Sequence, residues 1–140
     1  MPFTTLFACT QDLTDAATAL LQLDARPAPA ALDAARTRLI EAMRIHTATK
    51  DRLLLSVLRE SEDCAHLGMA RRTTEQDLEW RQRTLDHFAA WPLRAVLADP
   101  QGHHRATQRL LRLFERRVAH QEQLLLPMAH EALSQRRRAA

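Results

Sequence analysis

The sequence is poor in the residues that build strands and turns. It contains no tyrosine, few valines and isoleucines, and only two glycines among its 140 residues. Leu, Ala, Arg, Gln and Glu dominate instead, and all five favour helices. Because no alternating strand pattern is present, the composition sets β structure aside and predicts an all-α protein.

Cysteines and long apolar runs are also scarce. Cys9 and Cys64 are too few and too far apart for a disulfide framework or a zinc cluster, so we expect two buried or half-buried thiols. No stretch approaches the roughly 18 apolar residues of a membrane span. The N-terminus lacks the basic and apolar regions of a signal peptide. We therefore expect a cytoplasmic protein without a membrane partner.

Catalytic motifs are absent as well. The spacing supplies no Ser-His-Asp set, no Gly-rich phosphate loop and no Cys-His nucleophile pair, so we expect no enzyme. The formal net charge is +3, and the only lysine is Lys50. Much of the excess lies in the tail at Arg136, Arg137 and Arg138. Elsewhere Arg alternates with acidic residues, as on solvated helix faces, so nucleic-acid binding is not expected.

Apolar residues recur at alternating steps of three and four, the spacing of one helix face. The expected helices span residues 4–23, 31–60, 74–91 and 103–126. The third should begin at a capping box made by Thr74 and Asp77. It carries one apolar row of Leu78, Leu85 and Phe88, and beside it a second row of Trp80, Thr84, His87 and Trp91.

Four amphipathic helices joined by short links pack best as an antiparallel up-down four-helix bundle. The length allows one modest core and is too short for two. We therefore predict a single domain over residues 1–140. A short basic tail at 135–140 should fray. Asp99 to Gly102 is predicted to form a turn.

The second and fourth helices repeat one pattern. Residues 46–60 align without a gap on residues 117–131, so that His46 matches Arg117 and Lys50 matches Gln121. Each polar pair lies four residues apart on an otherwise apolar stripe, and three leucines follow in both segments. Two such helices would form one polar pocket in the core, as bundles that hold two metals do.

These segments resemble the hemerythrin-like (HHE cation-binding) family, in which a His is followed four residues later by a Glu, then by Leu and Phe or Leu, then by Pro. The resemblance implies a bundle with two irons that bind oxygen or nitric oxide. It also implies single inward His residues on the first and third helices, where this chain has Thr10 or Gln11 and Trp80.

Most of the implied ligands are replaced. His46 alone is retained, Lys50 and Gln121 stand in for carboxylates, and Arg117 stands in for a His. Lys and Arg offer no lone pair and repel a metal ion. The sequence thus predicts a degenerate core pocket of His46, Lys50, Trp80, Arg117 and Gln121, without metal or other cofactor.

Three functional hypotheses follow. The first is a non-enzymatic, metal-free hemerythrin-like domain that regulates or binds another protein, with a homodimer left open. The second is an iron-binding sensor of oxygen, nitric oxide or redox state that uses an unconventional ligand set around His46. The third is a pocket for a small anion, lined by His46, Lys50, Arg117 and Gln121.

Simpler interpretations stand beside these. His46 is expected to be a hydrogen-bonded core histidine. Lys50 and Arg117 either reach solvent or pair with a buried anion. The candidate partners are Asp51, Glu41 and Glu122. Among the other residues, we expect Trp80 and Trp91 to fill the core or rim, His120 to face water, His103 and His104 not to share a metal, and His87 with His46 to remain a minor alternative metal pair.

Overall fold

The computed structural model describes residues 3–139, which form helices and no strand, so the predicted all-α class is confirmed. Two π-helical stretches lie within the long helices. The elements are α1 (Thr4–Leu21), α2 (Pro29–Lys50), η1 (Asp51–Leu55), α3 (Ser56–Arg59), α4 (Cys64–Ala90), α5 (Leu93–Ala98), α6 (Pro100–His120), η2 (Gln121–Leu125) and α7 (Leu126–Ala139).

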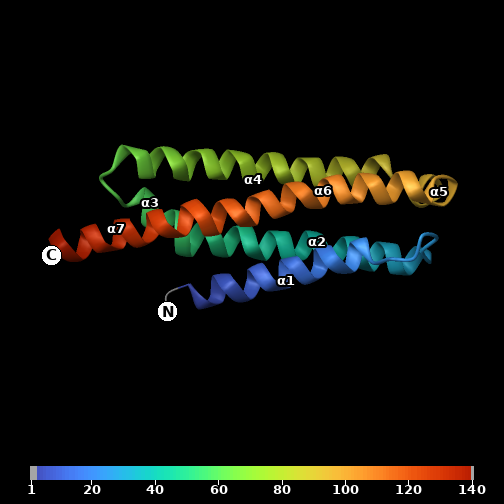
Figure 1. The fold of residues 1–140 in the computed structure, drawn as a ribbon, viewed down its shortest axis with the longest axis horizontal. Helices are drawn as coiled ribbons and strands as arrows, with labels where there is room; N and C mark the ends of the chain where they lie inside the picture. Colours follow the sequence, from blue (N-terminus) through green and yellow to red (C-terminus); the bar gives the residue numbers. More distant parts are fainter. Residues whose placement is uncertain (1–2, 140) are drawn as a thin grey trace.

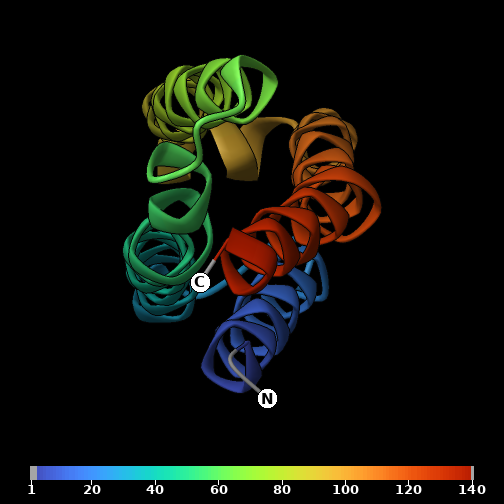
Figure 2. The ribbon, with the colours of Figure 1, turned by 90° about the vertical axis from the view of Figure 1, so that its left-hand side faces the viewer.

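The long helices lie side by side along one axis (Figure 1). α1, α2, α4 and the combined α6–η2–α7 stretch follow this axis, and consecutive ones run in opposite directions. Seen end on, they surround a shared interior (Figure 2). Within the described residues, no helix combines the length and the apolar character needed to cross a membrane.

The third long helix, α4, begins at Cys64 instead of Thr74. Asp63 is its N-cap, because one carboxylate oxygen accepts a hydrogen bond from the Ala65 amide at 2.8 Å. The predicted capping box is therefore wrong. Thr74 lies inside the helix and donates to the carbonyl oxygen of Ala70, while Asp77 is buried.

The predicted turn at Asp99 to Gly102 is the first turn of α6. The Asp99 carboxylate accepts a hydrogen bond from the Gly102 amide at 3.0 Å, and Pro100 occupies the first helical position. A side chain on Gly102 would clash with that carboxylate. A kink or restart is expected at Pro127, but η2 continues into α7 at Leu126 without a break in the helix. Residues 135–139 of the predicted frayed tail are helical; residue 140 lies outside the described part.

The buried face of α4 is the second of the two rows seen in the sequence. Trp80 and Thr84 are buried, whereas Leu78 is 62% exposed and Leu85 is 39% exposed. Leu78 and Leu85 of the apolar row thus lie off the core face of this helix, whereas the partly buried Phe88 packs against one of the two apolar clusters. Asp77 and Trp80 lie on the same side, which faces α6.

The interior consists of two apolar clusters separated by polar residues. One cluster includes Leu6, Leu54 and Leu125, and the other includes Leu13, Met43 and Phe114. On each long helix, polar side chains occupy the positions between the two clusters, and all of them are buried except Arg117, whose side chain is 13% exposed. We call this set the polar layer; its members are Thr10, His46, Thr49, Lys50, Thr73, Asp77, Arg117 and Gln121.

Candidate functional site

An ion-pair network dominates the polar layer. Lys50 Nζ lies 2.7 Å from Asp77 Oδ2, and the two side chains are 1% and 3% exposed. Arg117 Nη2 lies 2.7 Å from Asp77 Oδ1, and Arg117 Nε donates to the same oxygen at 3.1 Å. One carboxylate on α4 therefore serves cations from α2 and α6.

Asp77 was not among the anion partners expected from the sequence. Those candidates are wrong because each lies near the surface, where Asp51 pairs with Arg59, Glu41 pairs with Arg44, and Glu122 is exposed. Lys50 does not reach solvent either. Asp77 could have been found from its spacing, since it precedes Trp80 and Thr84 by three and seven residues on the buried row.

A hydrogen-bonded chain crosses the other half of the polar layer. His46 Nε2 lies 2.9 Å from Gln121 Oε1, and Gln121 Nε2 donates to Thr10 Oγ1 at 3.1 Å. The Thr10 hydroxyl donates to the carbonyl oxygen of Leu6 at 2.8 Å. The amide nitrogen of Gln121 donates to Thr10, so its amide oxygen faces His46. Because an amide oxygen only accepts hydrogen bonds, His46 carries its proton on Nε2. Its Nδ1 is buried without a hydrogen-bond partner among residues 3–139.

Burial controls the protonation of this layer. It lowers the pKa of His46 to about 4, and the charge of Lys50 acts in the same direction. Burial likewise lowers the pKa of Lys50, against the opposing effect of Asp77. His46 is therefore neutral at pH 7. Its burial and its hydrogen bond with Gln121 agree with the interpretation as a hydrogen-bonded core histidine.

The remaining positions implied by the family resemblance fall in different places. Thr10 belongs to the polar layer, but Gln11 is exposed and hydrogen-bonds Asp15. Trp80 fills the adjacent apolar cluster and packs on Phe114, with the ring centroids 5.9 Å apart. The layer position on α4 is taken by Asp77, one turn before Trp80.

Histidines outside the layer do not join His46. His87 stacks on His103 with ring centroids 5.8 Å apart, which does not support the minor alternative of a metal shared by His87 and His46. His103 is buried and His104 exposed, consistent with different directions for neighbouring residues. His120 is half-buried, not fully in water, and burial lowers its pKa.

The two thiols also differ. Cys9 is buried and donates to the Leu6 carbonyl oxygen at 3.2 Å, and burial raises its pKa. Cys64 is exposed, against the expectation of a half-buried thiol.

The polar layer does not fit two iron ions. Two cations sit beside its single carboxylate, and both Asp77 oxygens already accept charged hydrogen bonds. A di-iron site requires several carboxylate and histidine donors to coordinate the metals and to cancel their charge. The arrangement instead holds four helices together through polar contacts.

Comparisons with family models, with curated proteins and with solved structures found no match for the chain. The likeness to hemerythrin-like proteins therefore depends on the residues of this chain alone.

Proposed function

We propose that this chain is a degenerate, metal-free hemerythrin-like protein, an antiparallel up-down four-helix bundle that acts as a non-enzymatic regulatory or protein-interaction domain in the cytoplasm. The ion pairs of Lys50 and Arg117 with Asp77 carry this proposal. Lys50 and Arg117 stand at two of the ligand positions of the family motif, and Asp77 contacts both of them from α4.

The charge of these residues favours a structural over a metal-binding role. With His46 neutral, the layer contains two cations and one anion. The excess positive charge opposes a metal ion, which argues against the iron-based alternative. The anion-binding alternative is weakened in turn, because an added anion would have to displace Asp77 from both cations.

A groove of about 350 Å³ between α2 and α4 supports an interaction role. Apolar side chains line it, with an arginine on each helix. The residues used in the argument are Ile40, Met43 and Leu78 for the apolar lining, and Arg81 for the charge, since Arg44 already pairs with Glu41. This combination suits a partner helix that has both apolar and acidic side chains.

The occupant of the groove is tested by light scattering. If a second copy of the chain binds there, the wild type is dimeric and Leu78→Asp is monomeric. A monomeric wild type excludes the homodimer and leaves a different protein as the partner. Leu85→Asp is the control, because Leu85 is exposed on α4 but does not line the groove.

The metal-free assignment is tested by elemental analysis of protein purified from iron-supplemented cells, with an absorbance scan for oxo-bridged iron. We expect no core iron. Two irons per chain would overturn the proposal.

The descent from a metal site is tested by restoring ligands. In the combined variant Lys50→Glu, Arg117→His, Gln121→Glu, the layer regains carboxylates and a histidine beside His46 and Asp77. We expect this variant to bind iron when the wild type does not. A variant that folds, as judged by circular dichroism, but binds no iron would count against the proposed ancestry.

A further inference from the structure

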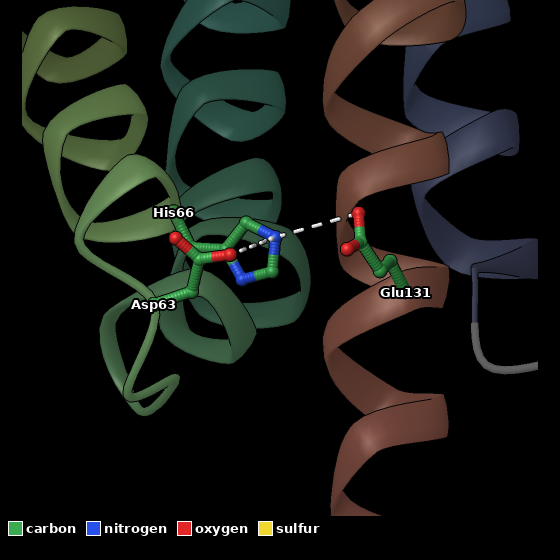
Figure 3. Close-up of side chains that lie close together, drawn as sticks. All are labelled: Asp63, His66 and Glu131. Carbon is green, nitrogen blue, oxygen red and sulfur yellow. Dashed lines mark ion pairs between the residues drawn. The ribbon is translucent and has the colours of Figure 1, made fainter.

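We propose that Asp63, His66 and Glu131 bind one divalent transition-metal ion, with zinc as the best fit. Asp63 caps α4, His66 lies in its first turn, and Glu131 lies on α7 (Figure 3). The cluster is separate from the polar layer, and no sequence pattern predicted a role for these residues.

The three side chains converge without hydrogen-bonding one another. His66 Nε2 lies 3.8 Å from Asp63 Oδ2 and 3.7 Å from Glu131 Oε2, as the dashed lines in Figure 3 show. Both separations exceed a hydrogen bond. Zinc bonds of about 2.0–2.2 Å place neighbouring ligands of a tetrahedron about 3.4 Å apart. All three ligand atoms lie within 4.8 Å of one another, and closure around an ion would bring them to that spacing.

His66 is held in the orientation that a ligand needs. Its side chain is 2% exposed, and Nδ1 lies 2.7 Å from Ser61 Oγ. Ser61 Oγ also accepts a hydrogen bond from the Asp63 amide at 3.1 Å, which fixes the hydroxyl. When Nδ1 donates to Ser61, the lone pair of Nε2 faces the two carboxylates. Metal-bound histidines commonly use their second nitrogen in this way.

Each carboxylate keeps one oxygen for the ion. Asp63 uses Oδ1 to cap Ala65, and Glu131 uses Oε1 to accept from Gln135 at 3.4 Å. Their other oxygens, Oδ2 and Oε2, face His66. The 55% exposed Glu131 is free to move inward. Two carboxylates and a neutral imidazole cancel the charge of a divalent ion, and water completes a zinc tetrahedron.

Metal binding here would connect distant parts of the chain. Asp63 and His66 lie at the α3–α4 junction, whereas Glu131 lies on the C-terminal helix. An ion pair between Arg136 and Glu60 already joins these two regions. Zinc therefore stabilises the docking of α7 against the start of α4.

The test is a calorimetric titration of EDTA-treated full-length protein with zinc ions, together with thermal melts. We expect one ion per chain and a melting temperature that rises with zinc concentration. Asp63→Asn, which retains an N-cap residue, and Glu131→Gln should each weaken binding at least tenfold. Melts in EDTA establish that both variants fold.

Two exposed residues provide matched controls: Glu122→Gln and His104→Gln should bind zinc as the wild type does. The proposal is overturned if the wild type binds no stoichiometric zinc, or if binding survives both carboxylate changes. This test does not depend on whether the polar layer is metal-free. Zinc at this site would bind as one ion per chain and be lost in Glu131→Gln, whereas iron in the polar layer would bind as two ions per chain.

Discussion

At the residue scale, Asp77 is the side chain on which the polar layer depends. It provides the counter-charge for a lysine that is 99% buried and for an arginine on another helix. A buried ion pair need not stabilise a fold relative to apolar side chains, but loss of one partner leaves an uncompensated charge. Replacing Asp77 should therefore lower the free energy of unfolding more than replacing Lys50 does.

We predict that Asp77→Asn lowers the free energy of unfolding by about 3–5 kcal/mol, because Lys50 and Arg117 lose their shared anion. Lys50→Met should stay within about 1 kcal/mol of the wild type, since the Asp77–Arg117 pair remains and a buried charge disappears. Urea unfolding measures both values. Asp86→Asn, at an exposed position of α4, is the control, and an equal loss there would contradict the prediction.

His46 should make stability depend on pH. Its pKa is about 4 in the folded chain and near 6.5 in the unfolded chain, so between these values the unfolded state binds more protons. The free energy of unfolding therefore falls as the pH drops from 7 to 4, by about 3 kcal/mol from this group.

Urea unfolding between pH 7 and pH 4 measures this effect. The pH dependence should be weaker in His46→Gln than in the wild type. It should not vanish, because burial also lowers the pKa of His87 to about 4. Equal pH dependence in the two proteins would show that His46 does not titrate as described.

At the element scale, the helix ends and faces decide which residues meet. The Asp63 cap starts α4 well before the predicted capping box, and the polar row of this helix faces inward. Both repeated segments change to π-helix at the layer, with η1 after Lys50 and η2 at Gln121. Such stretches add a residue to a turn and often occur at functional sites.

The inward face of α4 predicts a contrast between two nearby residues. Trp80→Ala should lower the free energy of unfolding by about 3–5 kcal/mol, because it removes a buried ring that packs on Phe114. Leu78→Ala should change it by less than about 0.5 kcal/mol, since Leu78 is largely exposed. Urea unfolding of the two variants checks this. If Leu78→Ala lowered the free energy of unfolding more than Trp80→Ala, the row that contains Leu78 would be the one that faces the core.

At the scale of the whole molecule, part of the positive charge is paired with acidic side chains. Arg44, Arg59, Arg83 and Arg136 each form an ion pair with an acidic residue. These pairs offset part of the basic charge, and the chain keeps a formal net charge of +3.

Because nucleic acid is not the expected partner, we predict no specific binding to it, and at most the weak, salt-sensitive attraction of a basic protein for phosphates. Fluorescence anisotropy with a labelled DNA duplex should show binding that decreases steeply as salt increases from about 50 to 200 mM, because phosphate contacts release counterions. Arg137→Gln and Arg138→Gln together should weaken any residual binding. Tight, salt-resistant binding would contradict the expected protein partner.

The sequence by itself determined the helical class, the approximate extents of the first two long helices and the two polar pairs on apolar stripes. Helical periodicity and the spacing of His46 with Lys50 and of Arg117 with Gln121 are local properties. Only the tertiary structure decided that Asp77 joins two of these residues, that Trp80 faces inward in place of Leu78, and that Asp63, His66 and Glu131 converge. These outcomes depend on which helix faces pack together, and packing brings together residues whose separation in the chain leaves no periodic signal.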